Sequence, residues 1–249
     1  MNSEYIAIID SGVGGLSVLK NLYNSFPNEK FLYFGDNDNA PYGNKDKKIL
    51  LEITKKNIDF IKSFGVKILI LGCNTLSALI LDEIKEYSKI LTFGVFPPVE
   101  YAIGKGKKVL LLSTVRTAER YASIDGLDTL GLIDLAKDVE KNHFFLSDID
   151  IKNHIENLSV GHFTNQKGYY DAIILGCTHY FFVKNKIIDH FQPREIFSSE
   201  DFIVKELNKY CKLSKTIEKS RENNILFVGK NAEFNKNFSV KSGCLWENI

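Results

Sequence analysis

Short runs of continuous apolar residues recur along the whole chain, and they constrain its fold more than any other feature. Seven such runs, rich in β-branched and aromatic residues, cover 5–10, 31–36, 67–73, 90–96, 108–114, 171–177 and 225–229. A run that is apolar at every position is typical of a strand buried on both faces, as in parallel sheets. Helical patterns lie between the runs. In the pattern at 46–64, one predicted apolar stripe contains Ile49, Ile53, Phe60 and Phe64.

Two of these runs end in the same three residues, Leu-Gly-Cys. The chain reads "ILILGCNT" at 68–75 and "AIILGCTH" at 172–179. Because parallel α/β sheets bind ligands at the carboxyl ends of their strands, both Cys73 and Cys177 are candidates for a functional site. Two similar α/β halves, each offering one cysteine, could face each other across a cleft.

Strands that alternate with helices predict βαβ units with right-handed crossovers. Adjacent prolines interrupt this pattern within 94–100. We therefore predict a first α/β domain made of 1–95 plus 203–249, and a second made of 96–202. The last apolar run is expected to return to the first domain.

Composition excludes several classes of function. The formal net charge of the 249 residues is +1, which provides no broad basic face for nucleic acid. No apolar stretch approaches the length of a membrane span, and no charged segment precedes the first run, so we expect a cytoplasmic protein. The four cysteines form no C-x-x-C pair, which argues against structural zinc and against a disulfide framework. We interpret Cys211 and Cys244 as small buried hydrophobes.

The neighbours of the two repeated cysteines suit thiol chemistry. A cysteine just before a helix feels the positive end of the helix dipole, which favours the thiolate. Asn74, Thr75 and Thr178 offer donors for a carboxylate beside each thiol. If the chain stays extended after Cys177, the side chain of His179 points the same way and can exchange a proton with that thiol.

Asp10 ends the first apolar run and is placed by the same topology to serve the other thiol. It could also cap the helix predicted after it. The segment "DSGVGG" at 10–15 resembles a phosphate loop, but it lacks the GK[ST] of a P-loop and matches G-x-G-x-x-G poorly. A small carboxylate bound at this helix N-terminus needs the same physics and no nucleotide.

Four segments together resemble the glutamate racemases. "DSGVGGLSVL", "YFGDNDNAPYG", "GCNTLSA" and "GCTHY" occur in the order and approximate spacing of that family, and the resemblance covers nearly the whole chain. It implies two pseudo-symmetric α/β domains with the active site in the cleft between them. It also implies a racemase that uses no cofactor and no metal and makes D-glutamate for bacterial peptidoglycan. Members of the family commonly form homodimers.

The resemblance also implies a role for each matching residue. Cys73 would deprotonate the D-isomer with Asp10 beside it, and Cys177 would deprotonate the L-isomer with His179 beside it. Inversion at one carbon needs a base and an acid on opposite faces, which gives the repeat a physical reason. The implied substrate-binding residues are Asp10, Ser11, Tyr42, Gly43, Asn74, Thr75, Thr114, Thr117, Thr178 and His179.

The chain departs from the family pattern at several positions. Asn37 stands where the family has threonine or serine, and Glu140 is the one match left in the drifted segment 135–141. Arg116 is introduced between Thr114 and Thr117. It is either a solvated arginine at a helix start or a partner for the distal carboxylate of the substrate.

Three other functions remain open at this point. A racemase of aspartate or another acidic amino acid would keep both thiols and change only the lining of the site. A cysteine hydrolase would use Cys177 as nucleophile and His179 as base, but it gives Cys73 no role. A non-catalytic amino-acid binding module would tolerate the loss of either thiol.

Some relatives carry an N-terminal extension for a cell-wall activator; we expect none, because the first run begins at about Tyr5.

Overall fold

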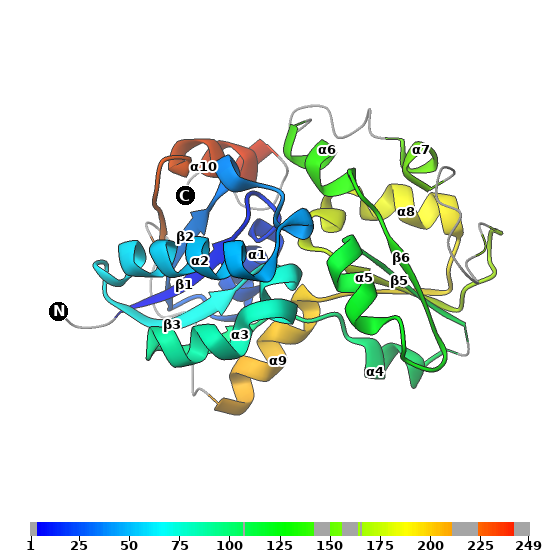
Figure 1. Cartoon of the computed structure of the whole chain (residues 1–249), viewed down its shortest axis with the longest axis horizontal. Coiled ribbons are helices and arrows are strands. Elements are labelled where there is room, and N and C mark those ends of the chain that lie inside the picture. Colours follow the sequence, from blue (N-terminus) through cyan, green and yellow to red (C-terminus); the bar gives the residue numbers. More distant parts are fainter. Residues whose placement is uncertain are drawn as a thin grey trace.

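The computed structural model describes residues 4–106, 108–141, 150–155, 164, 166–210 and 224–241. These residues form two lobes side by side, each built on a parallel sheet with helices packed against it (Figure 1). The α/β fold class predicted from the apolar runs is confirmed.

The first sheet has five parallel strands in the order β4-β3-β1-β2-β9. Its strands are β1 (Tyr5–Asp10), β2 (Lys30–Gly35), β3 (Val66–Leu71), β4 (Leu91–Gly94) and β9 (Ile225–Phe227). As predicted, the last apolar run returns to this sheet, where β9 pairs with β2.

The second sheet has four parallel strands in the order β6-β5-β7-β8. Its strands are β5 (Val109–Ser113), β6 (Leu127–Gly131), β7 (Ala172–Gly176) and β8 (Glu195–Ser198). Numbered from the first strand of each lobe, both sheets contain the order 2-1-3-4. The two lobes are therefore repeats of one topology, and β3 is equivalent to β7.

Helices connect the strands and cover the sheets (Figure 1). The α-helices are α1 (Leu16–Ser25), α2 (Lys47–Lys62), α3 (Asn74–Ser88), α4 (Val99–Ile103), α5 (Val115–Tyr121), α6 (Leu135–Lys141), α7 (Ile151–Ile155), α8 (Lys184–Phe191), α9 (Glu200–Tyr210) and α10 (Ala232–Lys241). The 3₁₀ helices within the described residues are η1 (Asn37–Asn39), η2 (Tyr42–Asn44) and η4 (Thr178–Val183). Among the described helices, none combines the length and apolarity that crossing a bilayer requires.

All seven predicted strands are present, but β6 and β8 were not predicted. Both are edge strands of the second sheet, and several of their residues are only partly buried. An edge strand can keep polar residues such as Asp128, so it does not show the continuous apolarity of a strand buried on both faces.

The predicted stripe of α2 is wrong. The helix buries Leu50, Thr54, Ile58 and Ile61, whereas Ile49 and Phe60 are 47% and 45% exposed. Two adjacent apolar stripes are available in this sequence, and contact with the sheet selects the one that continues through Ile58 and Ile61.

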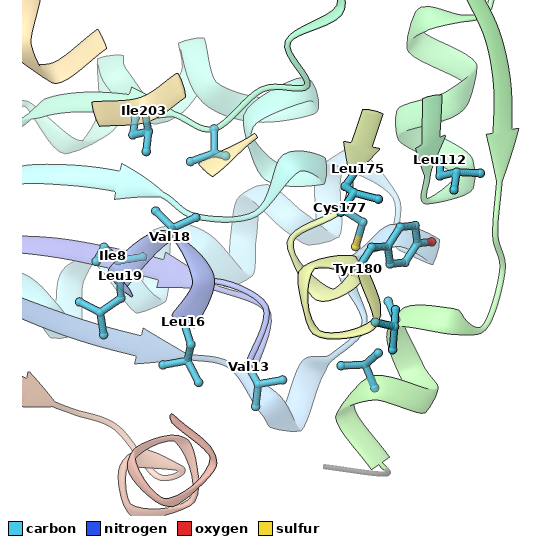
Figure 2. Close-up of a cluster of buried hydrophobic side chains, with 14 of the residues drawn as sticks. Ile8, Val13, Leu16, Val18, Leu19, Leu112, Leu175, Cys177, Tyr180 and Ile203 are labelled. Atoms are coloured by element: carbon cyan, nitrogen blue, oxygen red, sulfur yellow. The ribbon is translucent and has the colours of Figure 1, made fainter. Parts of the chain in front are cut away.

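One apolar cluster spans both lobes. Figure 2 shows Val13 and Leu16 of the first lobe in the same cluster as Leu112, Cys177 and Tyr180 of the second. The chain crosses back to the first lobe after β8, where α9 packs against α1. The predicted domain limits at 95/96 and 202/203 stay a prediction.

Candidate active site

The two repeated cysteines occupy equivalent places in the two lobes. Cys73 directly precedes α3 after β3, and Cys177 directly follows β7. In sheets of this order the crevice for ligands forms at the carboxyl ends of the first and third strands, where the strand order reverses. Both thiols are free and each residue is 7% exposed. The repeat in the sequence is therefore a repeated position in the fold.

Cys73 is the N-cap residue of α3. The backbone N–H groups of Thr75 and Leu76 act in the expected direction and favour its thiolate. Burial outweighs them and, with the nearby Asp10 carboxylate, raises the pKa of the Cys73 thiol well above its ordinary value. These surroundings therefore favour the protonated thiol of Cys73 over its thiolate.

Cys177 lies beside His179, which in turn contacts Glu140. Its sulfur is 3.7 Å from Nδ1 of His179, and Nε2 of His179 is 2.7 Å from Oε1 of Glu140. The predicted proximity of Cys177 and His179 is present, but the chain is not extended there, because η4 begins at Thr178 and its turn brings the ring back. Burial alone would lower the pKa of His179; the hydrogen bonds to Cys177 and Glu140 outweigh burial and raise it well above its ordinary value.

Glu140 reaches the site from α6 and joins the two lobes. Its Oε1 also accepts a hydrogen bond of 2.6 Å from the backbone N–H of Val13, and its Oε2 accepts one of 3.0 Å from Asn37. Although burial opposes ionisation, these bonds and the one from His179 lower the pKa of Glu140. A Cβ at Gly12 would lie 1.7 Å from Oε1, so only glycine permits this approach.

Asp10 is fully buried at the end of β1. It accepts hydrogen bonds from the backbone N–H of Gly12 at 2.9 Å and from the hydroxyl of Thr178, across the lobes, at 3.4 Å. Burial raises the pKa of Asp10, and His179 partly opposes this rise. Asp10 is not the N-cap residue of α1, which is Gly15, although its carboxylate also interacts with the backbone N–H of Gly15.

The side chain of Asn74 offers an acceptor rather than the donors that were predicted. Its Nδ2 donates to Val95 O at 3.1 Å and to the hydroxyl of Ser199 at 2.8 Å. Its Oδ1 is buried and has no partner. This oxygen is the atom that the side chain can offer to a ligand.

Threonine hydroxyls connect the lobes beside Cys73. The Oγ1 atoms of Thr75 and Thr114 are 3.1 Å apart, and Thr114 donates to Thr117 at 3.2 Å. The Cα of Gly43 packs so closely on Thr114 that an added Cβ would lie 2.7 Å from its side chain. The predicted residues Thr75, Thr114, Thr117 and Gly43 are therefore brought together.

Tyr42 is held by a buried carboxylate that was not predicted. Its hydroxyl donates to Oδ2 of Asp36 at 2.6 Å, and Asn39 donates to both oxygens of the same carboxylate. Burial and Asp36 raise the pKa of Tyr42, so it remains a neutral donor. Ser11 is also buried, in the loop that follows Asp10.

Arg116 points away from this site. Its Nη2 is 3.0 Å from Oδ1 of Asp46, and its side chain is 42% exposed. A second contact, of 3.7 Å, reaches Glu119 within α5. The structure favours the interpretation as a solvated arginine, with an ion pair that links α5 to the start of α2.

No group of three or more metal-binding side chains is found among the described residues. Cys211 and Cys244, interpreted from the sequence as small buried hydrophobes, lie outside those residues.

The arrangement supplies two thiols, each with a proton partner, in a site nearly closed to water. Cys177, His179 and Glu140 also form a nucleophile–base–orienter series like that of cysteine hydrolases. That reaction would leave Cys73 and Asp10 without a role.

The sequence identifies Glu140 only as a match to the family pattern. The closely spaced glycines of the 10–15 loop are the signal that could have indicated the close approach of another side chain to this loop.

Comparisons with known proteins identify similar chains. A scan against known protein-family models found no match. The chain is 34% identical over 224 residues to a glutamate racemase of Helicobacter pylori, covering 84% of this chain and 88% of that protein. It is 32% identical over 198 residues to a glutamate racemase of Clostridium botulinum, covering 75% of each. The crystal structure of glutamate racemase from Campylobacter jejuni superposes with a TM-score of 0.80 at 25% identity, over 98% of this chain and 100% of that one.

Proposed function

The chain belongs to the glutamate racemase family, and we propose that it interconverts L- and D-glutamate by moving protons between two thiols. The observation that carries this proposal is the equivalent placement of Cys73 and Cys177 at the ends of β3 and β7. Two repeated lobes that face each other can present a base to one face of a carbon and an acid to the other. Without a second thiol, the centre can be deprotonated but not inverted.

For L-glutamate, Cys177 takes the α-proton. The C–H bond breaks and the proton moves to the sulfur, while the electron pair spreads into the α-carboxylate. His179 is hydrogen-bonded to this sulfur and to Glu140, so it can hold a positive charge that stabilises the thiolate before the transfer.

For the same reaction, Cys73 delivers a proton to the opposite face. Burial and Asp10 favour the protonated form of this thiol, which is the form that donation requires. The product is D-glutamate with Cys73 as thiolate and Cys177 as thiol. The reverse reaction exchanges the two roles, with Asp10 beside the base.

The α-hydrogen is weakly acidic, so fixed donors and the exclusion of water must supply much of the rate. We assign the α-carboxylate to the donors around Thr75, Thr178 and His179. The unpartnered Oδ1 of Asn74 suits the α-ammonium group. The distal carboxylate is assigned to Ser11, Gly43, Thr114, Thr117 and the backbone of Tyr42, whose hydroxyl already donates to Asp36.

One experiment distinguishes this function from its alternatives. Each enantiomer of glutamate and of aspartate is incubated with the protein in D₂O, and the α-proton signal and optical rotation are followed. We expect both glutamate enantiomers to exchange the α-proton and lose rotation, with aspartate unchanged. Faster racemisation of aspartate would establish the alternative substrate. Absence of exchange with all four compounds would reject a racemase.

The proposal extends to cellular role and assembly. D-Glutamate made by this reaction would supply the bacterial cell wall. The homodimer expected from the family resemblance is also part of the proposal. Light scattering on the purified protein gives its mass in solution, and a mass equal to that of one chain would contradict a dimer.

A further inference from the structure

A series of polar contacts runs from α10, near the end of the described chain, to Cys177. Nδ2 of Asn235 donates to Oδ1 of Asn37 at 2.9 Å, and Nδ2 of Asn37 donates to Oε2 of Glu140 at 3.0 Å. Glu140 then contacts His179 at 2.7 Å, and His179 lies 3.7 Å from the sulfur of Cys177. Figure 1 shows α10 on the first lobe facing α6, which carries Glu140, on the second.

The position of Asn235 is unusual for its residue type. Asparagine is a poor residue for a helix interior, yet Asn235 lies inside α10 and is 1% exposed. A Cβ at Gly35 would lie 2.6 Å from its Nδ2, so the end of β2 has room for this amide only because it carries glycine. A buried amide that a neighbouring strand accommodates in this way calls for a specific partner; Asn37 is the partner of its Nδ2, whereas its Oδ1 is buried without one.

The bond from Asn235 sets which way the Asn37 amide faces. Because Oδ1 of Asn37 accepts from Asn235, its NH₂ group is directed at Glu140. If the amide turned over, its oxygen would face the carboxylate oxygen and repel it. Glu140 contacts Val13 and His179 through Oε1, and the Asn37 amide donates to its Oε2.

We propose that Asn37 and Asn235 are positioning residues for the Cys177 half of the reaction: they orient the Glu140 carboxylate that aligns His179 with Cys177. The inference rests on the proposed racemase function for its kinetic consequences. The Cys73 half uses different hydrogen bonds, because Asp10 accepts from Gly12 and Thr178, and His179 and Glu140 act on Asp10 only through their charges. Loss of the two asparagines should therefore impair one half of the reaction selectively.

Racemisation rates alone cannot show this selectivity. The two enantiomers have equal free energies, so kcat/KM must fall equally in both directions for any variant. Elimination from a glutamate with a leaving group on the β-carbon needs only one base, which removes the α-proton as the leaving group departs. With the L-enantiomer it reports the Cys177 half, and with the D-enantiomer the Cys73 half.

The test compares Asn37→Ala, Asn235→Ala and Asn37→Asp with Asn237→Ala, an exposed asparagine of the same helix. We expect Asn37→Ala and Asn235→Ala to slow elimination from the L-enantiomer by about ten- to a hundredfold, the range for losing a hydrogen bond to a charged group. Elimination from the D-enantiomer should change less than about threefold. Asn37→Asp keeps the shape but sets a carboxylate against Glu140, so it should be the slowest variant. Asn237→Ala should match the wild type.

A second measurement does not depend on the reaction. In an NMR titration of imidazole nitrogens, the pKa of His179 should fall in Asn37→Ala and Asn235→Ala and stay unchanged in Asn237→Ala. Equal losses for both enantiomers, or an unchanged His179 titration in both variants, would overturn the inference. A wild-type protein that neither racemises nor eliminates would reject the proposed function, and the titration would then decide the positioning role alone.

Discussion

The carboxyl group of Glu200 is buried at the point where the chain crosses between the lobes, so its ionisation is unfavourable. Glu200 is the first residue of α9, directly after Ser199, and is 1% exposed. Its Oε1 is buried without a partner. Burial raises the pKa of Glu200 from 4.5 to about 8; the charge of Asp201 adds to this rise, whereas Lys184 and a hydrogen bond with Ser17 oppose it.

The raised pKa makes stability depend on pH with a definite sign. Between pH 4.5 and about 8 the folded protein keeps a proton on Glu200 that the unfolded chain has lost. The contribution of Glu200 to stability is therefore greatest below pH 4.5, falls as pH rises through this window, and levels off above it. Each pH unit inside the window costs about 1.4 kcal/mol, so the free energy of unfolding should fall by about 2.5 kcal/mol from pH 5 to pH 7 through this group alone.

Glu200→Gln removes the titration and keeps the shape of the side chain. Its free energy of unfolding, relative to wild type, should rise by about 2.5 kcal/mol between pH 5 and pH 7. If the side chain of Glu200 moves in the wild type so that water reaches its carboxylate, this difference becomes smaller, but it should stay above about 1 kcal/mol. Urea unfolding of both proteins at pH 5, 6, 7 and 8, followed by circular dichroism, measures the difference. Glu195→Gln, at an exposed position of β8, is the matched control. A difference between Glu200→Gln and wild type that does not change with pH would refute the reasoning.

Three further outcomes are expected. Gly12→Ala should displace the Glu140 carboxylate, because the added Cβ would lie 1.7 Å from it. We expect kcat/KM to fall by about a hundredfold or more while the circular dichroism spectrum stays that of the wild type; near-normal activity would contradict this packing. Arg116→Ala should change KM for glutamate less than about twofold, because Arg116 and its ion-pair partner Asp46 are both exposed. A tenfold rise in KM confined to substrates with a distal carboxylate would instead show that Arg116 binds that carboxylate. Activity should survive EDTA and hydroxylamine but not thiol alkylation, and glutamate should protect; loss on chelation with recovery on adding zinc would contradict a mechanism by thiols alone.

The sequence predicts what local pattern determines. Strands buried on both faces are continuously apolar, so seven of them could be recognised, whereas the partly exposed edge strands β6 and β8 could not. Cys73, Cys177, Asp10 and His179 could be named because the strand ends of a parallel sheet meet at one edge.

Contacts between distant segments could not be predicted. The orientation of Asn74 depends on Ser199, 125 residues away, and the carboxylate of Glu140 is held by Val13, 127 residues away. Such contacts follow from how the lobes pack, which leaves no periodic signal in either segment. Likewise, the stripe of α2 that faces the sheet depends on contact with the sheet, because two apolar stripes compete in its sequence.

The central claim, that two opposed thiols act on one carbon, is tested most directly by elimination from a β-substituted glutamate in Cys73→Ala and Cys177→Ala. Each variant keeps one base, so neither should racemise glutamate. Cys73→Ala should eliminate only from the L-enantiomer, through Cys177, and Cys177→Ala only from the D-enantiomer, through Cys73. Elimination from both enantiomers by a single variant, or racemisation by either at a near wild-type rate, would contradict the two-thiol account.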